Sequence, residues 1–96
     1  MSFADHMRKT VRLMILRVLL ETPGFRGNSS VLFDLLNQMG YAVGREGVKD
    51  EFRWLAGERL VLLEDAGSVL LATLTEQGQD VAGGFSFVDG VARKVI

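Results

Sequence analysis

The sequence predicts one small α+β domain, mainly because the hydrophobic period changes along the chain. Over roughly the first sixty of the 96 residues, apolar side chains recur at helical spacing. Two continuous apolar runs then indicate extended strands, and a short helical stretch follows them. A composition of 48% hydrophobic and 24% charged residues is typical of a folded globular domain. A chain of this length supplies one hydrophobic core but not two.

A first helix is expected from about Ala4 to Leu20, and it is apolar on two sides. One side carries residues spaced for a single helix face, namely Met7, Val11, Met14, Ile15, Val18 and Leu19. Leu13, Leu16 and Leu20 cluster on nearly the opposite side. We expect this second side to contact another subunit or the chain's own tail, or else to be sunk in the domain's own core. The helix ends at residues 22–24, Thr-Pro-Gly.

Two more helices are expected before residue 60. After a very short strand at Phe25 and Arg26, the second helix has three possible N-caps, which are Asn28, Ser29 and Ser30. It stops at Gly40, a residue suited to a left-handed helix end. The third helix runs from about Arg45 to Glu58, and its buried stripe is Val48, Phe52 and Leu55.

The remainder predicts a hairpin, a short helix and a tail. Residues 60–64 and 69–74 form the two strands, joined by residues 65–68. The last helix covers about residues 74–82, capped by Thr73 or Thr75. Residues 85–96 show no clear period, so we expect either an extended arm on a neighbouring molecule or loose order. The expected division is therefore a domain at 1–84 and a tail at 85–96.

The order of three helices, a hairpin and a short helix resembles the winged helix-turn-helix fold. In bacterial regulators of this fold, two apolar residues lie three apart in the third helix, and a Leu-Val pair follows about five residues later. Phe52, Leu55 and residues 60–61 match that pattern, and residues 74–78 match the Leu-Thr-x-x-Gly sequence that ends the wing. Arg59 departs from the pattern, because those regulators commonly have Gly there. Either the turn differs or Arg59 carries modest backbone strain.

The chain also resembles a group of small uncharacterised proteins encoded by Mu-like prophages. In that group an arginine precedes the third helix, a Trp-Leu pair lies within it, and Leu-Thr-x-x-Gly follows the hairpin. Arg45, Trp54-Leu55 and residues 74–78 fit these positions, and the resemblance covers roughly residues 5 to 91. It supports the fold and says little about activity, since one fold hosts many functions.

The resemblance implies double-stranded DNA as a partner, with the third helix in the major groove. Arg45, Lys49 and Arg53, spaced by four, form a basic stripe on this helix. Arg26 beside Ser29 and Ser30 forms a possible phosphate clasp at the start of the second helix. Ordinary helix capping by Asn28 and the two serines is the interpretation that we favour over the clasp.

The charge balance favours an alternative, a winged-helix module that binds another phage or host protein without binding DNA. The net charge is −1, whereas nucleic-acid binders usually carry a basic excess. The third helix, with Arg59, has as many acidic as basic residues, and the hairpin tip begins with Glu64 and Asp65. Trp54 points away from the buried stripe, so it either packs inside the domain or joins an interface.

No enzyme, cofactor or metal site is expected. His6 is the only histidine and the chain has no cysteine, so thiolate ligands and disulfides are excluded. No nucleophile–base pair or phosphate-binding glycine loop is present. The longest apolar run, residues 13–20, is interrupted by Arg17 and is too short to cross a membrane. We therefore expect a cytoplasmic, non-enzymatic homodimer with no membrane partner, in which Leu13, Leu16, Leu20 and Trp54 are the candidate interface residues.

Overall fold

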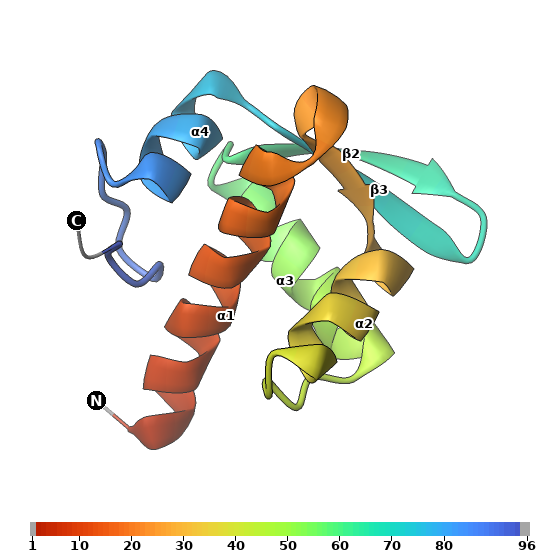
Figure 1. Cartoon of the computed structure of the whole chain (residues 1–96), viewed down its shortest axis with the longest axis horizontal. Helices are drawn as coiled ribbons and strands as arrows, with labels where there is room; N and C mark the ends of the chain where they lie inside the picture. Colours follow the sequence, from red (N-terminus) through yellow and green to blue (C-terminus); the bar gives the residue numbers. More distant parts are fainter. Residues whose placement is uncertain (1, 95–96) are drawn as a thin grey trace.

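The computed structural model describes residues 2–94, and within them the chain forms four α-helices and a three-stranded antiparallel sheet (Figure 1). In chain order the elements are α1 (Phe3–Glu21), a 3₁₀ turn η1 (Pro23–Phe25), β1 (Arg26–Asn28), α2 (Ser29–Gln38), α3 (Arg45–Gly57), β2 (Val61–Ala66), β3 (Val69–Leu74) and α4 (Glu76–Gly83). The predicted α+β class is therefore confirmed, and the first and third helices end within one residue of their expected bounds.

Helix α1 runs through the middle of the molecule, with α4 and the C-terminal segment on one side and α2 on the other (Figure 1). It starts at Ser2, whose hydroxyl oxygen accepts a hydrogen bond from the Asp5 amide at 3.1 Å. Ile15 and Leu19 are fully buried on the core side. Because other segments of the chain cover α1 from two sides, both of its apolar surfaces are buried within a single chain.

The second apolar side of α1 is covered by the chain itself, which corrects the expected subunit interface. Leu13 is 7% exposed and Leu16 is 0% exposed, while Leu20 packs partly buried against the core. Helix α4 packs against α1, and residues 85–94 extend the cover (Figure 1). The Ala92 amide donates to the Lys9 carbonyl oxygen at 3.1 Å, and Val91 is buried. The described part of the tail is thus an ordered piece of the domain.

The sheet has the order β1–β3–β2, so the expected hairpin gains a third strand. Arg26 of β1 pairs with Thr73 of β3, which confirms a short strand close to the expected place. In the hairpin, Ala66 pairs with Val69, and the turn between them contains Gly67 at a φ of +73°. Strand β2 therefore runs two residues further than expected, because Asp65 and Ala66 still pair with β3.

The junction between α3, β2 and α4 explains the Leu-Thr-x-x-Gly sequence. Arg59 has a φ of +62°, so a non-glycine residue occupies the left-handed turn that leaves α3. The Thr75 hydroxyl donates to the Arg59 carbonyl oxygen at 2.8 Å, and the Thr75 amide donates to the Leu60 carbonyl oxygen at 3.1 Å. The Thr75 hydroxyl oxygen also accepts from the Gly78 amide at 3.0 Å, so Thr75 and not Thr73 caps α4.

Candidate functional site

A small polar pocket of about 80 Å³ lies where the N-terminal ends of α2 and α3 meet the hairpin turn. Its lining consists of Ser29, Ser30, Arg45, Glu46, Lys49, Ser68 and Val69. Four of the six side chains expected to contact DNA are therefore brought together at one place. The other two, Arg26 and Arg53, are not part of this lining.

The two serines differ in what their hydroxyl groups do. Ser29 is 3% exposed, and its hydroxyl oxygen accepts from the Leu70 amide at 3.1 Å, which ties α2 to β3. The hydroxyl oxygen of Ser30 accepts from Nη1 of Arg45 at 3.1 Å. Neither side chain caps the helix, because Asn28 does so by accepting from the Val31 amide at 2.8 Å.

The two cations of the pocket come from the first turns of α3. Arg45 is exposed, and its guanidinium lies 4.4 Å from the centre of the Phe33 ring. Nζ of Lys49 lies 3.4 Å from Oε2 of Glu46, which is largely exposed. The Lys49 side chain is 21% exposed and that of Glu46 is 78% exposed, so solvent on the Glu46 side weakens this ion pair. The described contacts of Arg45 are with a hydroxyl group and an aromatic ring, which do not neutralise its charge.

Arg26 and Arg53 lie outside the pocket, and each pairs with an acidic residue. The guanidinium of Arg26 is 3.3 Å from Glu64 of the hairpin, and that of Arg53 is 3.0 Å from Asp50 one helical turn earlier. All four side chains are about half or more exposed. The expected stripe of three cations on α3 is consequently interleaved with carboxylates.

Trp54 packs inside the domain around Arg12, a residue that the sequence analysis did not single out. The Arg12 guanidinium is 3.8 Å from the centre of the Trp54 ring, and its Nε donates to Oε1 of Glu51 at 2.8 Å. Its Nη1 donates to the Gly90 carbonyl oxygen at 3.0 Å. Gly90 has a φ of +95°, and a Cβ there would lie 2.5 Å from the Trp54 ring. This cluster joins three separate segments, which explains why spacing along one helix did not reveal it.

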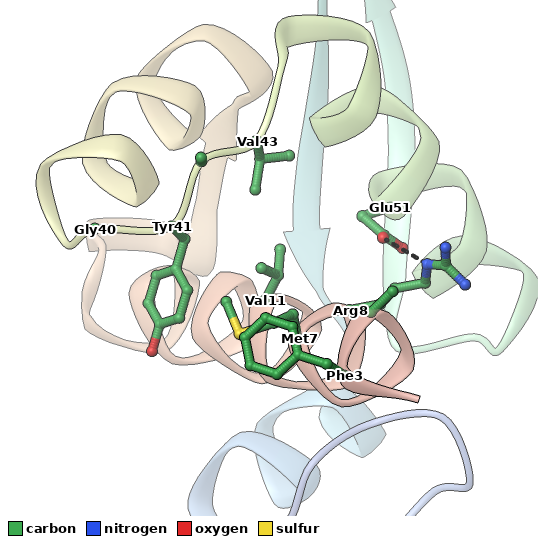
Figure 2. A pocket seen from close by; sticks show the side chains of 10 residues that line it. Phe3, Met7, Arg8, Val11, Gly40, Tyr41, Val43 and Glu51 are labelled. Carbon is green, nitrogen blue, oxygen red and sulfur yellow. Dashed lines mark ion pairs between the residues drawn. The ribbon is translucent and has the colours of Figure 1, made fainter. Parts of the chain in front are cut away.

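An apolar groove of about 460 Å³ lies between the N-terminal half of α1 and residues 40–43. Figure 2 shows Phe3 and Met7 of α1 on one side of it, facing Tyr41 and Val43 on the other. Arg8 and Glu51 form a 4.0 Å ion pair at its edge. Phe3 is 79% exposed. The sequence indicated no site here, because the residues between the second and third helices carry only the signals of a short link.

Within residues 2–94, no cluster of three His, Cys, Asp or Glu side chains is placed to hold a metal ion. None of the helices described in the structure is both long and apolar enough to span a bilayer.

Comparison with known proteins identifies relatives in a phage and in a bacterium. The chain is 39% identical over 89 residues to an uncharacterised protein, gp26, of Escherichia phage Mu, covering 93% of this chain and 92% of that protein. It is 31% identical over 78 residues to an uncharacterised protein of Haemophilus influenzae, covering 80% and 76% of the two chains. No known protein-family profile matches the chain.

Proposed function

We propose that this chain, which belongs to the same protein family as gp26 of Escherichia phage Mu, is a winged-helix protein that binds double-stranded DNA. The order of α1, α2, α3, a hairpin and α4 supports the winged-helix assignment. The additional strand β1 on the hairpin is compatible with it. In this arrangement α3 is the helix that enters the major groove.

The polar pocket at the N-terminal end of α2 is the observation that carries the proposal. It combines a guanidinium, an ammonium and hydroxyl groups from Arg45, Lys49, Ser30 and Ser68. A helix N-terminus favours anions because its first amide groups and its dipole present partial positive charge. A phosphate at this place would accept from the two cations and fix the orientation of α3 on the duplex.

The charges around the pocket predict weak binding with a shallow dependence on salt concentration. Glu46 and Asp50 stand beside the cations of α3, and Glu64 and Asp65 are exposed at the hairpin end. Carboxylates repel phosphates, so the hairpin stays off the DNA in this proposal. Few phosphates are then neutralised, and affinity depends on few released counterions.

Fluorescence anisotropy with labelled duplexes, phage Mu sequences included, tests the proposal at low ionic strength. Arg45→Ala and Lys49→Ala each remove one phosphate contact, so each should weaken binding on all sequences. The slope of log K against log salt concentration is negative, and its magnitude should decrease by about 0.9 for each lost contact. Arg93→Ala is the control, because it removes the same charge from a residue of the C-terminal segment that does not line the pocket and whose guanidinium lies over Phe87.

Two outcomes would contradict DNA binding at this pocket. One is no anisotropy change with wild-type protein at low salt. The other is an equal loss of affinity in Arg93→Ala and in the two pocket variants, which would indicate only a general charge effect.

A protein-binding module is the second candidate, and the acidic hairpin end favours it. Reversing both charges, with Glu64→Lys and Asp65→Lys, separates the two functions. If the domain binds DNA, the doubly reversed variant should bind more tightly, because two repulsive carboxylates become attractive. If the hairpin instead contacts a basic surface of a protein, the same variant should lose the partner captured by wild-type protein from phage-producing cells.

A further inference from the structure

A third side of α1, next to the C-terminal end of α2, is only partly covered, although Met14 and Val18 on this side pack against the core. A compact group of residues lies there. They surround a shallow hollow of about 200 Å³, and we call them the methionine patch: Met14, Arg17, Val18, Glu21 and Met39. Met14 and Val18 are partly buried, and Met39 is 43% exposed. Methionine is common at protein-binding surfaces, because its flexible thioether adapts to a partner's shape.

Two charged side chains of the patch have no ion-pair partner among the described residues. Across residues 2–94, neither Arg17 nor Glu21 forms an ion pair or a side-chain hydrogen bond, although they are one helical turn apart on α1. Arg17 is partly buried among apolar side chains. Burying a charge is costly unless it is paired, so a partner that offers a carboxylate here would be favoured.

We propose that a second copy of this chain docks on the methionine patch, with α1 against α1 around a two-fold axis. In such an isologous contact, Arg17 of each copy meets Glu21 of the partner subunit, so two ion pairs form at once. The patch carries one cation and one anion beside three apolar side chains, which makes it complementary to itself. This charge complementarity is the reason to prefer a second copy over another protein.

The area of this contact is small. A stable dimer buries about 800 Å² per subunit, which is about one-seventh of the 5601 Å² exposed by this chain, and the five patch residues supply less than that. Pairing Arg17 with Glu21 of the partner subunit places the two-fold axis near residue 19, so the two α1 helices overlap mainly over residues 17–21. We therefore expect a weak dimer, of the kind formed by small transient interfaces.

This dimer does not depend on DNA binding. The patch includes Met39, which follows the C-terminal end of α2, whereas the polar pocket lies at the N-terminal end of the same helix. Ten helical residues separate the two ends by about 15 Å. A second copy on the patch consequently leaves the polar pocket open.

Analytical ultracentrifugation of two charge-reversal variants tests the pairing. In Arg17→Glu, two carboxylates face two carboxylates across the axis, and in Glu21→Arg, four guanidinium groups meet. Each variant alone should be monomeric at concentrations where wild-type protein dimerises, in the range of about 10 to 100 µM expected for a modest interface. An equimolar mixture of the two variants should restore a dimer, because every cross-subunit pair is then attractive.

Arg93→Glu is the matched control, since it makes the same charge change on the C-terminal segment and should dimerise like wild-type protein. Thermal unfolding followed by circular dichroism verifies that each variant is folded. Wild-type protein that stays monomeric up to about 200 µM would overturn the proposal. Single variants that dimerise as wild type does, or a mixture that remains monomeric, would overturn the assigned surface equally.

Discussion

Of the glycines in the described part of the chain, Gly78 occupies the position where an added side chain would be tolerated least. A Cβ built at this position would lie 2.0 Å from the Leu60 carbonyl oxygen and 2.9 Å from a methyl group of Leu74. The carbonyl group belongs to the backbone where α3 passes into β2, and it also accepts from the Thr75 amide. The last glycine of the Leu-Thr-x-x-Gly sequence is therefore required by close backbone approach.

We predict that Gly78→Ala lowers the free energy of unfolding by about 2 to 3 kcal/mol, because the clash with backbone forces α4 away from the sheet. Urea denaturation of the variant measures this loss. Gly57→Ala is the matched control: Gly57 ends α3, and a Cβ there meets nothing within 4 Å. That control should be neutral or slightly stabilising, since alanine favours helix. Equal stabilities of the two variants would refute the steric explanation.

Ser29 and Ser30 show why the sequence left the roles of individual hydroxyl groups open. Both follow Asn28 at the start of a helix, where any of the three residues can act as cap. The Ser29 hydroxyl oxygen instead accepts a hydrogen bond from the Leu70 amide, 41 residues later in the chain. Such a partner depends on how β3 lies beside α2, and the local sequence of α2 contains no information about that placement.

At the scale of elements, Arg12 links α1 to α3 and to the C-terminal segment. Its side chain is only 11% exposed, and it makes an ion pair with Glu51, a hydrogen bond to Gly90 and a ring contact with Trp54. A buried guanidinium with several satisfied donors holds its neighbours in one arrangement. The Trp54 side chain is accordingly a packing residue in this chain, and its orientation away from the buried stripe of α3 brings it to α1.

We expect Arg12→Ala to lower the free energy of unfolding by about 2 to 4 kcal/mol, because Glu51 would be left partly buried without its nearest cation. Arg8→Ala serves for comparison, since Arg8 is 4.0 Å from Glu51 and about half exposed. Its loss should cost no more than about 0.5 kcal/mol. Chemical denaturation compares the two variants, and similar losses in both would argue against a special role for Arg12.

At the scale of the whole molecule, α1 is covered on a second side because α4 and residues 85–94 pack against it. Val91 is buried, and Val88 and Ala92 pack against the core from that side. This arrangement accounts for the high apolar content of the chain without a second subunit on Leu13 and Leu16. The partly covered methionine patch is a different surface of the same helix.

Truncation after Gly84 should therefore destabilise the domain strongly. It removes Val91 from the core and the Gly90 carbonyl group from Arg12, and we estimate a loss of about 3 kcal/mol. For a domain of this size the midpoint of thermal unfolding should fall by about 12 to 24 °C. Phe87→Ala, which alters an exposed side chain of the same segment, should change the midpoint little. An unchanged midpoint in the truncated chain would show that the segment is a dispensable tail.

Most of the fold was predictable because its information is local. The apolar period of α1, the stop at Gly40 and the Leu-Thr-x-x-Gly sequence each depend on residues close together in the chain, and all three have the expected place in the structure. The third strand of the sheet was only half predictable. A short strand at residues 25–26 was expected, but its pairing with β3 requires that distant segments meet.

The candidate site was predictable as a set of residue types but not as an arrangement. The spacing of Arg45 and Lys49 by four residues placed both on one side of α3, and the structure places both at the same pocket. Arg26 and Arg53 were chosen by the same reasoning, yet each lies beside a carboxylate outside that pocket. Long charged side chains select their partners after the elements have packed, so helical spacing alone does not separate the two groups.

The sequence by itself determined the order of the helices and strands, the apolar surfaces of each element and the glycine-bounded turns, since these follow from hydrogen bonding and side-chain spacing over a few residues. Only the tertiary structure decided which chain segment covers the second side of α1 and which groups satisfy Arg12. Those contacts join residues 39 and 78 positions apart. Their formation depends on how whole elements pack to bury apolar area, a property of the assembled domain that no short stretch of sequence contains.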